Sequence, residues 1–112
     1  MGVSLMSLNV TLRAMRMTEI FRGNYTHNVG KMASAAGIYQ AVWRPEELGI
    51  TLAGQLIEPL RAGVEKMESD PDKFKKLNPA NGWGSYAPFL AWLKEYLAAC
   101  EENPLAEVSV SI

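Results

Sequence analysis

The apolar residues of this chain change their spacing twice, and this change limits the folds open to it. Near the start, residues 6–14 (MSLNVTLRA) alternate apolar and polar side chains, which predicts a half-buried β-strand. Residues 17–21 (MTEIF) predict a second strand, joined to the first through a bend at 15–16. At the other end, residues 108–112 (VSVSI) alternate again and predict a third strand.

Between these strands the apolar residues recur every three or four positions, a spacing that is typical of amphipathic helices. The first helical segment is expected to start near Thr26, to break at Gly37 and to restart at Ile38. Pro45 ends it, because a residue that precedes proline is disfavoured in the helical region. The stretch 43–47 (WRPEE) is therefore expected to form a corner.

Two further helices and a short helical turn are predicted downstream. Thr51 is the expected cap of the second helix, and Pro59 is expected to kink that helix because proline lacks a backbone donor. The Asp-Pro-Asp sequence at 70–72 predicts the start of a short helical turn. Ser85 is the expected cap of the last helix, which ends at Asn-Pro in positions 103–104.

The expected order of elements is β-β-α-α-α-β. A mostly antiparallel sheet, made of the two N-terminal strands and the C-terminal strand, would bury its apolar face under about three helices, so we predict an α+β fold. The length of 112 residues suits a single domain, 1–112. With 48% hydrophobic and 21% charged residues, the chain can build a core without disulfides or metal. Whether the strands pair within one chain or across a homo-oligomer stays open.

The charge of the chain argues against nucleic acid as a partner. Eleven basic residues stand against twelve acidic ones, which gives a net charge of −1. Nucleic-acid binding needs a basic face, and the densest basic run, at 73–76, is too short to make one.

The opening residues MGVSLMSLNV predict neither a signal peptide nor a membrane anchor. Cys100 is the only cysteine, so we expect a cytoplasmic protein without an intramolecular disulfide. From the charge and the opening residues we expect that it binds neither nucleic acid nor membranes.

The decapeptide RGNYTHNVGK, residues 22–31, crowds polar side chains between the second strand and the first helix. One interpretation is a phosphate site, because a strand, a glycine-containing loop and a helix start follow in the right order. The spacing excludes a P-loop, since six residues rather than four separate Gly23 from Gly30, and Met32 stands where Ser or Thr is needed. Gly30 and Lys31 are also expected to lie within the helix already.

A second interpretation is catalysis by a small hydrolase. His27 would be the general base, Cys100 or a serine the nucleophile, and Asn24 or Asn28 the orienting group. This alternative is weakened because Cys100 belongs to the apolar stripe of a helix and no serine stands in a nucleophile-elbow context. One histidine, one cysteine and no clustered carboxylate pair also predict that the chain has no metal site.

A third interpretation is purely structural. Asn24 or Thr26 would cap the following helix, Asn28 would accept hydrogen bonds from its first turn, and His27 would point outward. At the corner, Arg44 would pair with one of the two neighbouring glutamates. In this interpretation the decapeptide is simply the start of a helix.

The interpretation we favour is ligand binding. Polar residues gather at two predicted helix starts and at the corner before Pro45. Two helix N-termini, a guanidinium and aromatic rings would together suit an anionic, planar molecule such as a nucleotide or nucleotide signal, without any cofactor. The expected floor of this site consists of Asn24, Thr26, His27, Asn28, Arg44, Asn81, Trp83 and Tyr86.

Three stretches also resemble an uncharacterised family of small bacterial and bacteriophage proteins. They are NYTHNVGKMASAAGIYQAVWRPEE at 24–47, NPANGWGSY at 78–86 and LKEYLAACEENPLAEVSVS at 93–111. Members of the family show an Asn-x-Thr-His-Asn motif, a Trp-Arg-Pro-Glu-Glu corner and an Asn-Gly-Trp-Gly loop. The resemblance covers nearly the whole chain from residue 8 onward.

The resemblance implies a small cytoplasmic protein of phage origin, and it implies no activity, cofactor or catalytic residue. Phage proteins of this size often bind host machinery as inhibitors or sponges, including host immune signalling. We therefore expect a non-catalytic binding protein rather than an enzyme. Its expected partner is a small anionic ligand or a host protein, an expectation drawn from genomic setting and not from chemistry.

Overall fold

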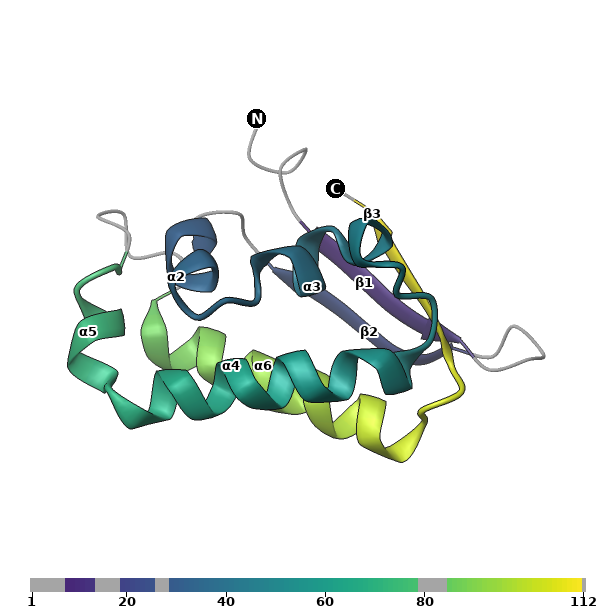
Figure 1. Ribbon diagram of the computed structural model, residues 1–112. Coiled ribbons are helices and arrows are strands. Elements are labelled where there is room, and N and C mark those ends of the chain that lie inside the picture. Colours follow the sequence, from purple (N-terminus) through teal and green to yellow (C-terminus); the bar gives the residue numbers. More distant parts are fainter. Residues whose placement is uncertain (1–7, 14–18, 26–28, 79–84, 112) are drawn as a thin grey trace.

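The computed structural model describes residues 8–13, 19–25, 29–78 and 85–111 (Figure 1). Strands β1 (Leu8–Arg13), β2 (Glu19–Tyr25) and β3 (Glu107–Ser111) form an antiparallel sheet in the order β2-β1-β3. The helical elements are α2 (Gly30–Ala35), α3 (Tyr39–Trp43), η2 (Pro45–Leu48), η3 (Ala53–Leu56), α4 (Ile57–Ser69), α5 (Pro71–Lys75) and α6 (Tyr86–Glu102). The predicted α+β class is confirmed, and the helical part is divided into more segments than predicted.

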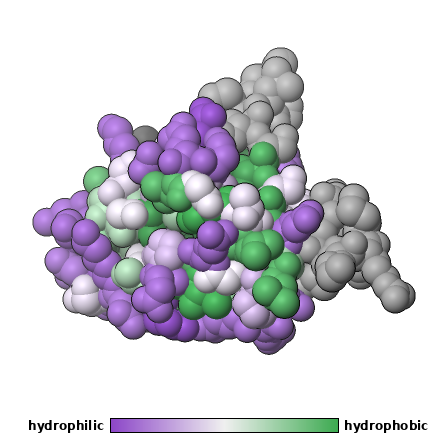
Figure 2. Space-filling view, turned by 45° about the vertical axis from the view of Figure 1, so that its right-hand side comes forward, coloured by the Kyte–Doolittle hydropathy of each residue, from purple (hydrophilic) through white to green (hydrophobic). Residues whose placement is uncertain are grey.

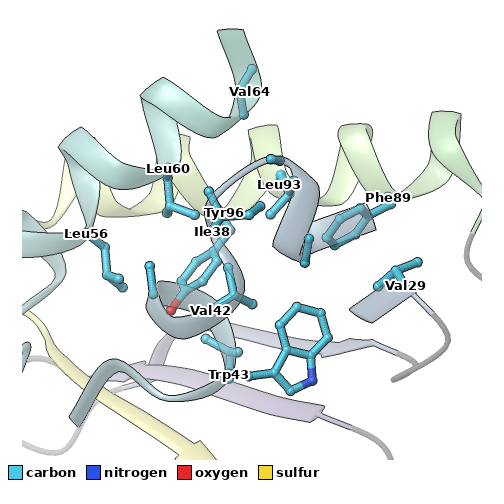
Figure 3. Packing of buried hydrophobic residues seen from close by; sticks show 14 of the residues in the cluster. Val29, Ile38, Val42, Trp43, Leu56, Leu60, Val64, Phe89, Leu93 and Tyr96 are labelled. Carbon is cyan, nitrogen blue, oxygen red and sulfur yellow. The ribbon is translucent and has the colours of Figure 1, made fainter. Parts of the chain in front are cut away.

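The central strand β1 has one buried face and one polar face. Leu8, Val10 and Leu12 are fully buried, whereas Asn9 between the first two is exposed. The residues of β3 that stand opposite Val10 and Leu12 are both valines, so the apolar face continues across the sheet. Figure 3 shows the helices packed on one side of the strands. The alternation of the sequence therefore selects which face of the sheet carries the core.

Large aromatic side chains fill the space between the sheet and the helices. Trp43 is fully buried, and Figure 3 places it between the strands and Phe89. Its ring lies 5.2 Å from the ring of Tyr39 in a parallel stack and 6.3 Å from Phe89 in a tilted contact. Tyr96 of α6 is also fully buried. These contacts join α3 to α6 over the sheet.

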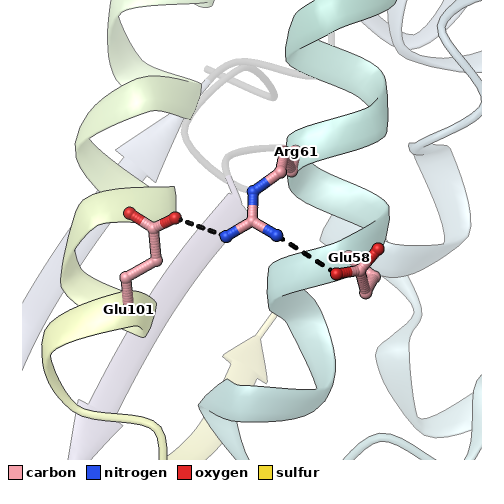
Figure 4. Close-up of polar contacts among 3 residues, drawn as sticks. All are labelled: Glu58, Arg61 and Glu101. Atoms are coloured by element: carbon pink, nitrogen blue, oxygen red, sulfur yellow. Dashed lines mark hydrogen bonds and ion pairs between the residues drawn. The ribbon is translucent and has the colours of Figure 1, made fainter.

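Helices α4 and α6 lie side by side along the edge of the molecule (Figure 1). Arg61 of α4 donates to Glu101 of α6 at 2.8 Å and to Glu58 of its own helix at 3.1 Å (Figure 4). Lys94 of α6 forms a second cross-helix ion pair with Glu68. All these side chains are largely exposed, so the ion pairs contribute little to stability beside the apolar contacts beneath them.

The position of β2 differs from the sequence prediction. A strand was expected over 17–21, but the ladder with β1 runs from Glu19 to Tyr25 and pairs Tyr25 with Leu8. Pairing with the six residues of β1 recruits Gly23 and Asn24, although both residue types are poor strand formers. Four of the ten residues of the polar decapeptide, 22–25, are therefore strand. Asn24 pairs with Asn9 and does not stand at a helix start.

The first α-helix among the described residues, α2, begins at Gly30, and its N-cap Val29 makes no side-chain capping bond. The helix start near Thr26 and its capping by Thr26 fall on 26–28, outside the described residues, and stay predictions. Capping by Asn24 was a wrong expectation, because Asn24 belongs to β2. The predicted break at Gly37 is confirmed, since Gly37 has a φ of +78° in the left-handed region that glycine tolerates best.

The second predicted helix is not kinked at Pro59. A 3₁₀ turn, η3, precedes α4, so Pro59 falls in the first turn of α4, where a backbone N–H has no partner in the helix anyway. Thr51 is not the cap either. The Gln55 side-chain oxygen accepts hydrogen bonds from the backbone N–H of Thr51 at 2.8 Å and of Leu52 at 2.9 Å.

Two other helix ends follow local signals more closely. Asp70 caps α5 by accepting a hydrogen bond from the N–H of Lys73 at 3.3 Å, and α6 ends at Asn103, both as predicted. Ser85 occupies the N-cap position of α6, but its side chain makes no capping bond there. The side-chain oxygen of Asn78 instead accepts from the N–H of Tyr86 at 2.9 Å.

Candidate functional site

The eight predicted ligand-binding residues divide into two groups. Thr26, His27, Asn28, Asn81 and Trp83 lie outside the described residues, so their convergence stays a prediction. The hydrolase alternative stays a prediction too, because it depends on His27. The structure places the remaining three, which are Asn24, Arg44 and Tyr86. Asn24 lies in β2, far from a helix start, as the register shows.

Tyr86 is a buried residue of α6 whose polar atoms are engaged inside the protein. Its hydroxyl donates to the backbone carbonyl of Met67 at 2.8 Å, and its N–H donates to Asn78. The ammonium of Lys75 lies 5.7 Å from the centre of its ring. Burial raises the pKa of the Tyr86 hydroxyl, and the nearby carboxylate of Glu68 adds to the rise. Tyr86 therefore links α6 to the end of α4 and to α5.

Arg44 is an exposed residue between α3 and η2. Its backbone N–H donates to the carbonyl of Gln40 at 2.8 Å, and its carbonyl accepts from the N–H of Glu47 at 3.0 Å. These bonds set the corner that the Trp-Arg-Pro sequence predicted. Within the described residues its side chain forms no ion pair with Glu46 or Glu47, so the guanidinium is free to meet a partner.

A shallow depression of about 430 Å³ opens beside this corner. Its walls come from the turn between α2 and α3, from α3 itself, from η2 and from the first turn of α4. The residues that line it are Ser34, Gly37, Tyr39, Gln40, Ala41, Leu48 and Pro59. Most of this lining is apolar, and concave apolar surfaces with a few polar groups are typical of binding sites.

Two of the lining residues are large and accessible. Leu48 is 48% exposed, so part of its apolar surface is accessible from the depression. Tyr39 is half-buried, and its ring is held by its parallel stack on Trp43. The aromatic wall of the depression is thus anchored to the core and needs little ordering when a partner binds.

Polar groups surround this apolar lining. The amide of Gln40 donates to the carboxylate of Glu47 at 3.2 Å, so both lie at the mouth of the depression. Ser34 contributes a hydroxyl from α2, and Glu46 is exposed next to Glu47. The polar groups of Ser34 and Gln40 can both donate and accept hydrogen bonds, and none of the lining residues is charged.

Sequence reasoning found the corner but missed the depression. The break at Gly37 and the stop at Pro45 were both predicted, and together they bring Tyr39 and Leu48 to one surface. The available signal was Leu48 itself, a leucine that belongs to no helical stripe and stands between Glu47 and Gly49. Gly49 has a φ of +72°, so the chain turns directly after Leu48.

The only cysteine is unsuited to nucleophilic chemistry in the folded protein. Cys100 is fully buried in α6, as the apolar stripe predicted. Burial raises its pKa to about 12, with a smaller contribution from Glu101, so the thiol is protonated at neutral pH. In the described part of the chain, no three residues of the metal-binding types His, Cys, Asp and Glu are grouped to hold an ion.

The surface of the molecule combines apolar and polar groups. In the view of Figure 2, apolar residues reach the surface and are bordered by hydrophilic ones. Among the helices that the structure describes, none combines the length and apolarity needed to cross a bilayer.

Comparisons with models of protein families, with curated proteins and with solved structures found no match to this chain.

Proposed function

We propose that this chain is a non-catalytic binding protein that contacts another protein through the depression between α3, η2 and α4. The observation that carries the proposal is the half-exposed Leu48 beside the anchored ring of Tyr39 on a concave surface. A partner side chain that enters the depression would remove apolar surface of both residues from water. This gain requires no rearrangement of the core.

The charges around the depression favour a protein partner over a nucleotide at this site. An anion placed here would meet no basic side chain among the lining residues, and the carboxylate of Glu47 lies 3.2 Å from the amide of Gln40 in the lining. A protein can instead present an apolar side chain to Leu48 and donors to Glu47. The small anionic ligand of the sequence analysis would need the loops at 26–28 and 81–83, and it stays a separate candidate on the strength of those motifs.

The resemblance to bacterial and bacteriophage proteins narrows the kind of partner. A phage protein of this type would act on a host protein in the host cytoplasm, for example as a counter-defence inhibitor. This part of the proposal rests on the resemblance, whereas the contact surface rests on the geometry of the depression. An experiment can therefore refute the host partner without refuting the contact surface, and the reverse.

Photo-crosslinking from the depression tests the proposal. A benzoylphenylalanine at position 34 lines the depression, and the same group at exposed position 109 on β3 is the matched control. We expect position 34 to capture a bacterial protein that position 109 does not. Burial of a leucine contributes about 1.5–3 kcal/mol, so Leu48→Asp should weaken capture roughly tenfold to a hundredfold.

Leu105→Asp is the control for a general effect of charge. Leu105 is 79% exposed and does not line the depression, so this variant should capture the partner as the unmodified chain does. Equal capture by the Leu48→Asp variant, with its circular dichroism unchanged, would show that the depression is not the contact surface. A thermal-shift screen against nucleotides and cyclic dinucleotides forms the second arm. A shift that persists in Leu48→Asp would favour the small-ligand candidate instead.

A further inference from the structure

The two edge strands of the sheet, β3 and β2, differ in the backbone hydrogen bonds that they form with other segments. On the β3 side, Val108 donates its N–H to the carbonyl of Thr51 at 2.9 Å, and Ala53 donates to the carbonyl of Ala106 at 2.8 Å. Leu52 also forms a bridge with Glu107. The segment from 51 to 53 thus covers the start of this edge, as proteins commonly do with exposed strand edges.

These bonds fix which backbone groups of every strand point outward. Because the N–H of Val108 points away from β1, its neighbour Ser109 faces β1 and forms the hydrogen-bonded pair with Thr11. Successive residues alternate, so Val10 faces β2 and forms the hydrogen-bonded pair with Gly23. The residues on either side of Gly23 must then direct their N–H and C=O groups away from β1.

The outer edge of β2 therefore presents the backbone groups of Arg22 and Asn24. In the part of the chain that the structure describes, no strand pairs with this edge. The ladder shifts register between Leu12 and Arg13, which leaves Ile20 as an extra residue in β2. This irregularity limits regular pairing along the outer edge to residues 21–25.

We propose that this edge pairs with β2 of a second copy of the chain, in an antiparallel arrangement centred on Gly23. Arg22 of each copy would then stand opposite Asn24 of the other, and each of these two pairs would exchange two backbone hydrogen bonds. In this register the position of Phe21 would stand opposite that of Tyr25. The two sheets would become one sheet with β3 at both ends.

The residues of β2 select this register over the alternatives. Only Arg22 and Asn24 present outward groups in the regular part of the strand, so three two-fold registers are open. A register centred on Arg22 would place two guanidinium-bearing residues directly opposite each other, which is unfavourable. A register centred on Asn24 would place Arg22 opposite position 26, beyond the end of β2. Centring on Gly23 avoids both problems.

Gly23 itself fits this arrangement. Glycine inside a strand weakens it and commonly marks a bulge or a place where another backbone approaches closely. The bulge lies at Ile20 and not at Gly23, so Gly23 is available for the close approach of another backbone. In a pair without mutual hydrogen bonds the two Cα atoms are only about 4.5 Å apart, which is where Gly23 would meet its copy.

Disulfide trapping tests the register directly. In a Cys100→Ala background, Gly23→Cys should form an intermolecular disulfide under mild oxidation, because a Cα separation of about 4.5 Å lies within the disulfide range. Ser109→Cys, on the exposed face of β3, is the matched control and should form it far more slowly. The unmodified chain should have twice its 12.4 kDa mass in sedimentation equilibrium.

Two proline variants distinguish the loss of the dimer from the loss of the fold of each copy. Arg22→Pro removes an N–H that has no partner within the ladder, so it should yield a folded monomer. Phe21→Pro removes an N–H that pairs with Leu12 and should disrupt the sheet itself. A 12.4 kDa unmodified chain at the highest attainable concentration would overturn the proposal. So would a dimer that survives Arg22→Pro, or equal trapping at positions 23 and 109.

Discussion

Gly63 is a position where one added methyl group should disturb the core. It lies buried in α4, where a Cβ built on it would stand 2.2 Å from the Cγ2 atom of Ile38 and 3.4 Å from its Cβ. Ile38 is only 1% exposed and precedes α3 directly, so its side chain cannot move into solvent. In Gly63→Ala, either α4 must shift outward or Ile38 must leave its rotamer.

The expected loss of stability follows from two opposing effects. Overpacking of a core typically costs about 1–3 kcal/mol, and a carbon–carbon separation so far below van der Waals contact belongs at the upper end of that range. Replacing glycine by alanine inside a helix contributes roughly 1 kcal/mol in the opposite direction. We therefore expect Gly63→Ala to lower the free energy of unfolding by about 2 kcal/mol. For a domain of this size that corresponds to a fall in Tm of roughly 8–16 °C.

Urea unfolding followed by the fluorescence of the buried Trp43 measures this loss. Gly30→Ala is the matched control, because its Cβ would meet only the ring of Tyr39 at the ordinary distance of 3.9 Å. A second test is the double mutant with Ile38→Ala, which removes the clashing atom. Its loss should be smaller than the sum of the single losses by about 3 kcal/mol, because the whole overpacking cost disappears with the clashing atom. Additive losses, or an unchanged midpoint for Gly63→Ala, would refute the reasoning.

Three further predictions concern buried and exposed polar groups. Tyr86→Phe should cost about 1–3 kcal/mol in urea unfolding, because the carbonyl of Met67 loses its donor. Arg61→Ala should leave the midpoint of urea unfolding nearly unchanged although it removes two ion pairs, since both are exposed; a clear fall of the midpoint would contradict this. The raised pKa of Cys100 means that the unfolded chain loses this proton first. Stability should therefore fall between pH 9 and about 12, by at most about 1.4 kcal/mol per pH unit from this group, and Cys100→Ala should flatten the fall in pH-dependent unfolding.

The polar residues proposed as a ligand site illustrate the limit of sequence reasoning. Tyr86 follows a loop signal and carries a hydroxyl, so the sequence alone allows it to face a ligand or the core. Its burial is decided by the carbonyl of Met67, which lies nineteen positions away in the chain. Asn24 was placed at a helix start for similar reasons, and its pairing with Asn9 in β1 decided otherwise.

The amino-acid sequence by itself determined the features that depend on a residue and its immediate neighbours. The break at Gly37, the corner at Pro45 and the cap at Asp70 each follow from one backbone angle or one local hydrogen bond. The alternation in β1 likewise determined which side of the sheet is buried, because one face of a strand carries every second side chain.

Tertiary structure alone decided the features that depend on distant partners. The extent of β2 was set by its ladder with β1, and the start of α6 was capped by Asn78 rather than by the adjacent Ser85. The depression exists because the first turn of α4, at Pro59, lies beside the surface that Tyr39 and Leu48 share, and no local pattern brings α4 to that surface. The physical reason is common to all three: backbone donors and apolar surfaces accept any partner that packing supplies, and only the complete fold selects one.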